Sequence, residues 1–146
     1  MKPRFDVYST GYRSKDDKHA IYGAVVIATS PDGREKKIEL SRVIGDFTRN
    51  QADIISMLMA LDSILPEHRD CETVLHTPSN YAGQMVEKND NGGWLSTPKA
   101  NIEIVNEVRG IIDSYKSISI ILLILIKFKR PIVSSILLLY LFKFKF

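Results

Sequence analysis

The sequence predicts a mixed α/β domain, in which three antiparallel strands precede parallel strands and helices pack against the sheet. Two observations lead to this prediction. Strand-type patterns separated by turn residues fill residues 5–43, and from residue 48 the apolar residues recur mainly at the helical period. The 146 residues, of which 45% are hydrophobic and 25% charged, can bury a core and have the composition of a soluble domain.

The first part of the chain predicts an antiparallel meander of three strands. Residues 5–12 alternate well enough for a strand, and residues 20–28 are almost entirely apolar, as in a strand buried on both faces. Residues 30–33 read Ser-Pro-Asp-Gly and predict a turn, because proline presets φ and glycine tolerates the bend. Residues 37–43 then predict the third strand.

A helix is predicted directly after the meander. Thr48 and Gln51 have the spacing of a capping box, in which each side chain satisfies a backbone amide of the first turn. Pro66 ends the helix near residue 65, because proline cannot continue the backbone hydrogen bonds. The apolar stripe of this helix consists of Ile54, Ile55, Leu58, Leu61 and Leu65.

A strand and two further helices follow. Residues 72–77 predict a short strand, and Ser79 is a suitable cap for a short helix through Val86. Pro98 is a good residue for a first helical turn, and from there an amphipathic pattern continues to Tyr115. The expected order is therefore β-β-β-α-β-α-α, without an internal repeat.

The charge distribution divides the chain at residue 117. The formal net charge is +3, but five of the 20 lysine and arginine residues and none of the 17 acidic residues lie after residue 117, so residues 1–117 carry −2. No basic stripe of the kind typical of nucleic-acid-binding proteins is visible in this average. The single cysteine, Cys71, excludes an internal disulfide and a cysteine-based zinc site. Together with an N-terminus that lacks an apolar signal segment, this favours a cytoplasmic protein.

Five short segments stand out in order along the chain. They are 9–12 (STGY), 21–25 (IYGAV), 48–53 (TRNQAD), 76–81 (HTPSNY), and 93–95 (GWL) with 99–104 (KANIEI). In this order they resemble motifs of the ribonuclease H family, which are Thr-Asp-Gly-Ser in the first strand, a glycine in the second, Thr-Asn-Asn-Arg-x-Glu at a helix start, a strand ending Thr-Asp-Ser-x-Tyr, and a later Trp followed by Lys-x-Asn-x-x-Leu. The resemblance implies a ribonuclease H-like mixed five-stranded sheet flanked by helices, with residues 1–117 as the domain.

The resemblance also implies a two-metal nuclease site, of which most ligands are missing. Such a site needs several carboxylates around two divalent ions. By position, Thr10 replaces the first-strand Asp, Asp53 replaces the helix Glu, and Pro78 replaces the fourth-strand Asp. The final-helix Asp would lie after residue 126, where the chain has no acid. Asp53 is thus the one candidate catalytic and metal-binding residue, and Mg²⁺ or Mn²⁺ is expected only if activity survives.

Two other side chains were candidates for a rearranged ligand set. Asp6 has the same strand parity as Thr10, but lies four residues earlier, roughly 13 Å along an extended strand. His76 stands near the end of the fourth strand, where a structural role is the commoner one. For Asp53 itself, an equally good interpretation is a carboxylate that complements the positive end of the helix dipole.

Binding of nucleic acid can persist without cleavage. Arg49, Asn50, Asn80 and Tyr81 match positions at which the family contacts nucleic acid or frames the site, and Arg and Asn are suitable donors to phosphate and sugar oxygens. The alternative is a capped helix start and a packed tyrosine ring. Trp94 follows two glycines and either stacks on a base or anchors its loop to the core.

The composition changes sharply at residue 118, and three interpretations of residues 118–146 remain open. Residues 118–126 and 131–142 are suitable as a fifth strand and a final helix. Alternatively the tail is an interfacial membrane anchor, since its apolar runs are shorter than the ~20 residues that span a bilayer. The third interpretation is non-native read-through of an A/T-rich stretch, because the tail consists almost wholly of Ile, Leu, Phe and Lys.

The sequence therefore predicts a degenerate ribonuclease H-like domain, a pseudoenzyme that binds nucleic acid (an RNA–DNA hybrid or a structured RNA) or a protein partner and has lost two-metal hydrolysis. One alternative is an active metal-dependent endonuclease that cuts the RNA strand of RNA–DNA hybrids with a rearranged ligand set. Another is a non-enzymatic scaffold that contacts a membrane through the tail.

Overall fold

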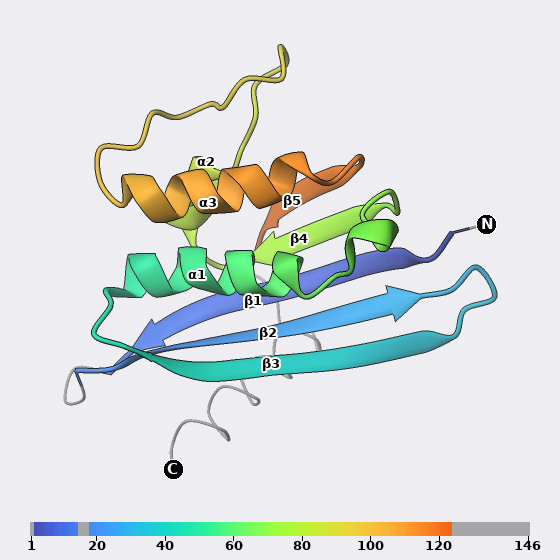
Figure 1. Cartoon of the computed structure of the whole chain (residues 1–146), viewed down its shortest axis with the longest axis horizontal. Helices are drawn as coiled ribbons and strands as arrows, with labels where there is room; N and C mark the ends of the chain where they lie inside the picture. The colour runs from blue at the N-terminus through green and yellow to red at the C-terminus, as the bar shows by residue number, and fades with distance from the viewer. Residues whose placement is uncertain (1, 15–17, 124–146) are drawn as a thin grey trace.

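A computed structural model describes residues 2–14 and 18–123, which form a five-stranded mixed sheet with helices packed against it (Figure 1). The strand order across the sheet is β3-β2-β1-β4-β5. The elements in chain order are β1 (Arg4–Arg13), β2 (Ala20–Thr29), β3 (Glu35–Gly45), α1 (Arg49–Asp62), the 3₁₀ turn η1 (Pro66–His68), β4 (Thr73–Thr77), α2 (Asn80–Met85), α3 (Ile102–Asp113) and β5 (Ile118–Leu122). The predicted fold class is confirmed.

The meander is antiparallel, as predicted. β2 pairs with β1 on one side and with β3 on the other, and its first seven residues are buried. The β2–β3 turn closes through the Gly33 amide, which donates to the Ser30 carbonyl at 2.9 Å. Gly33 has φ +88°, a conformation that side chains disfavour, so the glycine of the Ser-Pro-Asp-Gly segment is required here.

β4 and β5 are parallel to β1 and extend the sheet beyond it. The fifth strand that one interpretation of the tail predicted is present over Ile118–Leu122, so the first residues of that tail belong to the sheet. Residues 124–146, including the predicted final helix and the proposed membrane-contacting segment, lie outside the described part of the chain. Within the described residues, no helix is long and apolar enough to cross a membrane.

α1 begins with the predicted capping box. The Gln51 amide donates to Thr48 Oγ1 at 3.1 Å, and the Thr48 amide donates to Gln51 Oε1 at 2.9 Å. The end of the helix was predicted near residue 65 but lies at Asp62, and Pro66 instead opens the short turn η1. Proline is compatible with a first turn because its missing amide hydrogen would have no partner there.

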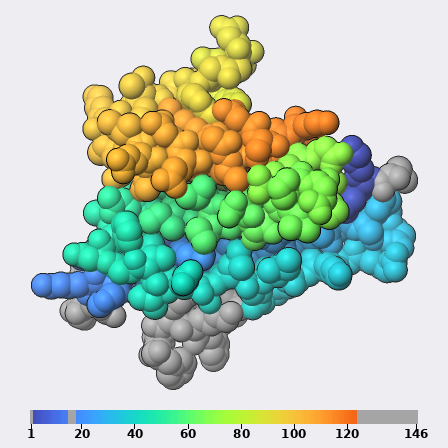
Figure 2. Space-filling view, in the orientation of Figure 1, coloured from blue at the N-terminus to red at the C-terminus, as the bar shows by residue number. Residues whose placement is uncertain are grey.

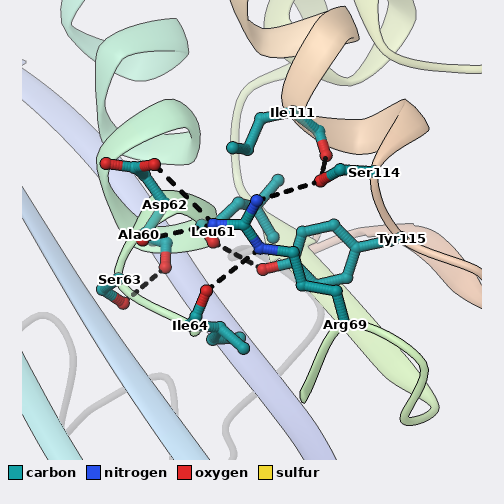
Figure 3. Close-up of polar contacts among 9 residues, drawn as sticks. All are labelled: Ala60, Leu61, Asp62, Ser63, Ile64, Arg69, Ile111, Ser114 and Tyr115. Atoms are coloured by element: carbon teal, nitrogen blue, oxygen red, sulfur yellow. Dashed lines mark hydrogen bonds and ion pairs between the residues drawn. The ribbon is translucent and has the colours of Figure 1, made fainter. Parts of the chain in front are cut away.

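The early end of α1 is stabilised by side chains that bind its free carbonyls (Figure 3). Arg69 donates to the Ile64 carbonyl at 3.0 Å and to Ser114 Oγ at 3.2 Å, and its guanidinium lies 5.5 Å from the centre of the Tyr115 ring. The Tyr115 hydroxyl donates to the Leu61 carbonyl, and burial raises the pKa of Tyr115 to about 12. Because the last carbonyls of a helix have no partner within it, these contacts replace water there and join α1 to the segment after α3.

α3 starts later than predicted. The amphipathic pattern was expected to begin at Pro98, but the helix begins at Ile102, because Asn101 adopts the left-handed conformation with φ 58°. Asparagine tolerates this conformation better than most residues, and a helix cannot pass through it. The short helix α2 begins after the Ser79 cap, as predicted, with Ser79 Oγ accepting from the Ala82 amide at 3.0 Å.

The core lies between the sheet and the layer formed by α1 and α3, which run side by side in Figures 1 and 2. Alternate residues of β1 and β2 point into it, because successive side chains of a strand point to opposite faces. The largest fully buried apolar side chains of the core are Val7, Ile54, Met57, Leu61, Leu75, Val86, Val105 and Val108. α1 packs on β1 and β2, and β3 extends beyond the helical layer.

Candidate nucleic-acid interface

Thr10, Asp53 and the start of the Pro78–Ser79 segment come together where β1 and β4 end. The Gly11 amide donates to Asp53 Oδ1 at 2.6 Å, which joins β1 to the first turns of α1. The approach is close enough that a Cβ on Gly11 would lie 2.3 Å from the Ala52 carbonyl carbon. Ser79, directly after Pro78, is near enough for its hydroxyl to lower the pKa of Asp53. These contacts bring Thr10 and the residue that follows Pro78 close to Asp53, at the positions that the family resemblance had grouped together.

The Asp53 carboxylate is enclosed by the protein. Only 5% of the residue is exposed, and burial raises its pKa above the ordinary aspartate value, because the charged form loses solvation. Four nearby groups lower the pKa of Asp53 again: the Gly11 amide, the Arg49 guanidinium, and the hydroxyls of Ser79 and Thr10. Asp53 therefore functions as a hydrogen-bond acceptor that joins α1 to β1.

The donor set does not fit a pair of divalent cations. Two Mg²⁺ or Mn²⁺ ions bring four positive charges and require several hard oxygen ligands, most of them anionic. Around Asp53 the neighbouring oxygens are neutral hydroxyls, and Pro78 offers no side-chain ligand. Among residues 2–14 and 18–123, no three His, Cys, Asp or Glu side chains are grouped closely enough to hold a metal ion. Asp16 and Asp17 lie outside the described residues.

Asp6 and His76 form a separate cluster. Because Phe5 and Val7 point into the core, Asp6 lies on the sheet face away from α1. Asp6 Oδ1 lies 3.1 Å from His76 Nε2 and 3.3 Å from an Arg4 guanidinium nitrogen. The His76 ring stacks on the Tyr8 ring at 4.2 Å with an angle of 7° between their planes. Asp6 and His76 thus already have partners, and Tyr8 stands between Asp6 and Thr10 along β1.

The predicted nucleic-acid-binding residues divide into an exposed set and a packed one. Arg49 and Asn50, in the first turn of α1, and Asn80, at the start of α2, are exposed. Tyr81 is half-buried, and its hydroxyl accepts a hydrogen bond from Asn101 Nδ2 at 3.1 Å. The exposed residues can reach a ligand, whereas Tyr81 positions the loop before α3.

Three residues that sequence analysis did not assign to the site take part in its framework. Gln51 Nε2 donates to Asn101 Oδ1 at 3.1 Å, so a single chain of hydrogen bonds joins α1, the start of α3 and Tyr81. Gln51 and Ser79 were recognised only as helix caps, yet Gln51 also binds Asn101 and the Ser79 hydroxyl lowers the pKa of Asp53. In the sequence, the asparagine of the Lys-x-Asn segment was the signal that could have revealed this connection, because asparagine often adopts the left-handed conformation that Asn101 has here.

Trp94 anchors its loop. Its ring lies between the Lys88 ammonium, at 4.7 Å from the ring centre, and the Arg109 guanidinium, at 4.8 Å. Arg109 also donates to the carbonyls of Met85 and Ser96, each at 2.8 Å. The indole is therefore used in cation–π contacts that hold the 86–101 segment against α3. This arrangement supports the anchoring interpretation over base stacking.

Comparison with known proteins gives structural matches only. No model of a protein family and no curated protein matches the sequence. The structure is similar to the N-terminal RNase H domain of Rv2228c from Mycobacterium tuberculosis (17% identity, TM-score 0.65, 82% of this chain and 86% of that chain). It is also similar to LC11-RNase H1, solved in complex with an RNA/DNA hybrid (18% identity, TM-score 0.65, 84% of this chain and 87% of that chain). A third similar structure is RNase H1 from Halobacterium salinarum NRC-1 (18% identity, TM-score 0.58, 82% of this chain and 85% of that chain). The strand order, the order of elements and these matches together show that the chain has the ribonuclease H-like fold.

Proposed function

We propose that this domain binds nucleic acid at the surface around the α1 and α2 starts and does not carry out two-metal hydrolysis of the phosphodiester. The observation that carries the proposal is the burial and hydrogen bonding of the Asp53 carboxylate. Asp53 is the only acidic residue at the family's four ligand positions, and it is buried, accepts the Gly11 amide and lies beside the Thr10 and Ser79 hydroxyls. A buried carboxylate that accepts a backbone hydrogen bond is part of the packing between β1 and α1 instead of an open ligand for cations.

The binding half of the proposal is supported by the exposed donors beside this site. Arg49 supplies a guanidinium that is always charged, and Asn50 and Asn80 supply amides on the same end of the domain. The related LC11-RNase H1 was solved with an RNA/DNA hybrid, which makes the hybrid the first ligand to test. Residues 1–117 carry a net −2, so binding depends on this local group of donors instead of a general positive field.

The test is a titration of the full chain with a fluorescein-labelled RNA–DNA hybrid, followed by anisotropy at several salt concentrations. We expect affinity that falls as salt rises, because phosphate contacts release counterions. We also expect that EDTA does not weaken binding, because no bound metal ion is needed, whereas Mg²⁺ should weaken it only as a competing counterion of the phosphates. Arg49→Ala should weaken binding about tenfold, since hydrogen bonds to a charged group contribute roughly 1.5–3 kcal/mol. Arg34→Ala is the matched control, because Arg34 is 84% exposed and lies in the turn at the opposite end of the sheet.

The same samples decide between binding and cleavage. Incubation of the labelled hybrid with Mg²⁺ or Mn²⁺ should leave the RNA strand intact. Metal-dependent cleavage that disappears in Asp53→Ala would establish the alternative, an active endonuclease with a rearranged ligand set. Absence of binding at low salt would refute the nucleic-acid proposal and leave the fold alone standing.

A further inference from the structure

We propose that β3 is a homodimer interface, at which two copies of the chain join their sheets edge to edge, antiparallel about a two-fold axis at Ile38. This inference is independent of the proposed nucleic-acid surface, which lies at the Thr10 end of β1. It would produce one continuous sheet with the helices of both copies on the same side.

The first support is the open edge of β3. β3 is the last strand on its side of the sheet, is 11 residues long, and is exposed over most of its length. In the described part of the chain, β2 is the one strand that pairs with it. An edge strand of this length is a template for a further strand, because the outer side of its backbone can form the hydrogen bonds of another ladder. Among the described residues, α1 packs on β1 and β2 and β3 extends beyond it.

The charges on β3 select one register. With Ile38 opposite its own copy, Lys37 faces Glu39 of the partner and Glu39 faces Lys37, which gives two opposite-charge pairs across the axis. Lys37 and Glu39 already lie 3.3 Å apart within one chain, so the four charges would alternate in sign around the axis. Lysines usually protect an edge against pairing, but here each lysine at position 37 has an acidic partner.

The neighbouring registers are less favourable. An axis at Lys37 would place two lysines opposite each other and Glu35 opposite Glu39. An axis at Glu39 would place the two glutamates together and Lys36 opposite Arg42. Like charges directly opposite each other destabilise a strand pair. The Ile38 register also places Arg34 opposite Arg42, but Arg34 lies before the first residue of β3, and this register alone among those compared has opposite-charge pairs next to the axis. An axis at residue 40 has no such repulsion, but it has no opposite-charge pair either.

The second support is an apolar hollow beside the axis. A cavity of about 670 Å³ opens between the first half of β3 and the end of α1, with Phe5, Val26 and Ile64 in its wall. At its rim, Ile38 is 52% exposed and Leu65 is 56% exposed. In the proposed dimer the two Ile38 side chains meet on the helical side of the sheet, so the two hollows face each other across the axis. Association would thus remove from water an apolar surface that the monomer leaves exposed.

Sedimentation equilibrium of the full chain, over a range of protein concentrations, tests the proposal with a charge-exchange cycle. Lys37→Glu places Glu opposite Glu39, and Glu39→Lys places Lys opposite Lys37. We expect either single variant to raise the dimer dissociation constant about tenfold, because two cross-strand pairs change from attraction to repulsion. The double variant, Lys37→Glu with Glu39→Lys, should restore the dimer. Lys99→Glu makes the same charge change on an exposed loop away from β3 and should leave the dissociation constant unchanged.

Each result decides for or against the β3 interface. Weakening of the dimer by both single variants, together with its recovery in the double variant, supports it, because the two single substitutions change the net charge in opposite directions and a general charge effect could not weaken both. A monomeric wild-type chain would overturn it. Association that is unaffected by Lys37→Glu would also overturn it and would locate the contact elsewhere, for example in the apolar residues 124–146. Circular dichroism of each variant verifies that the fold is retained.

Discussion

Substitution of Gly11 by alanine should separate β1 from α1. The added Cβ would lie 2.3 Å from the Ala52 carbonyl carbon and 2.4 Å from the Asp53 nitrogen. Carbon atoms in contact are normally at least about 3.5 Å apart, so the helix would have to move by about 1.2 Å. The Gly11–Asp53 hydrogen bond, now 2.6 Å, would then stretch beyond its useful range.

The expected loss of stability has two parts. Forcing an extra methyl into a packed contact costs about 1–3 kcal/mol, and loss of a buried hydrogen bond to a charged acceptor costs about 1.5–3 kcal/mol. We therefore expect Gly11→Ala to lower the free energy of unfolding by about 2.5–6 kcal/mol, a large share of the about 5–15 kcal/mol typical of a domain. Urea denaturation followed by far-UV circular dichroism measures this difference.

Gly110→Ala is the control, because it should raise the free energy of unfolding where Gly11→Ala lowers it. Gly110 lies in α3, and a Cβ there meets no atom within 4 Å. Alanine has the better helix propensity, so this variant should gain about 0.5–1 kcal/mol. A Gly11→Ala chain that unfolds within about 0.5 kcal/mol of the wild type would refute the close approach of β1 to α1, and with it the enclosed position of Asp53.

Three further predictions concern Asp53, Arg69 and Thr48. Because burial raises the pKa of Asp53, its ionisation lowers the stability of the folded state as the pH rises above about 4, the pKa of aspartate in the unfolded chain. The melting temperature of Asp53→Asn should therefore rise relative to that of the wild type between acidic and neutral pH, and a relative fall would contradict this. Arg69→Met leaves the carbonyls at the α1 end without donors and should cost about 2–3 kcal/mol in urea denaturation, whereas Arg34→Met, at an 84% exposed ion pair, should change stability by less than about 0.5 kcal/mol. Thr48→Ala removes the cap of α1 and should cost about 1 kcal/mol; an unchanged melting temperature would mean that the capping box contributes nothing.

The local patterns predicted the sheet and helices well, because each depended on short-range rules. The alternation of apolar and polar residues predicted β1, and the apolar run predicted the buried strand β2. The spacing of Thr48 and Gln51 predicted the start of α1, where the structure has the capping box. The errors lay at helix ends. Arg69 and Tyr115 stabilise the end of α1 through side-chain contacts to backbone carbonyls, and Tyr115 lies 54 residues after the Leu61 that it contacts, so helix propensity alone could not show where α1 ends.

The candidate site was only partly visible in the sequence. Motif positions placed Thr10, Asp53 and Pro78 together, and the structure brings β1, α1 and the β4 end into contact there. The burial of Asp53 could not be predicted, because it depends on how closely Gly11 lets β1 approach α1. The Gln51–Asn101 connection is equally a tertiary contact between segments 50 residues apart.

The environment of Trp94 gives this protein an internal optical reporter. The chain has one tryptophan, so its whole indole emission originates from a ring held between Lys88 and Arg109. Opening of the 86–101 segment would change that emission even while the sheet stays intact. Fluorescence and far-UV circular dichroism would therefore report different events, and the interval between their denaturation midpoints would measure how independently this segment detaches from α3.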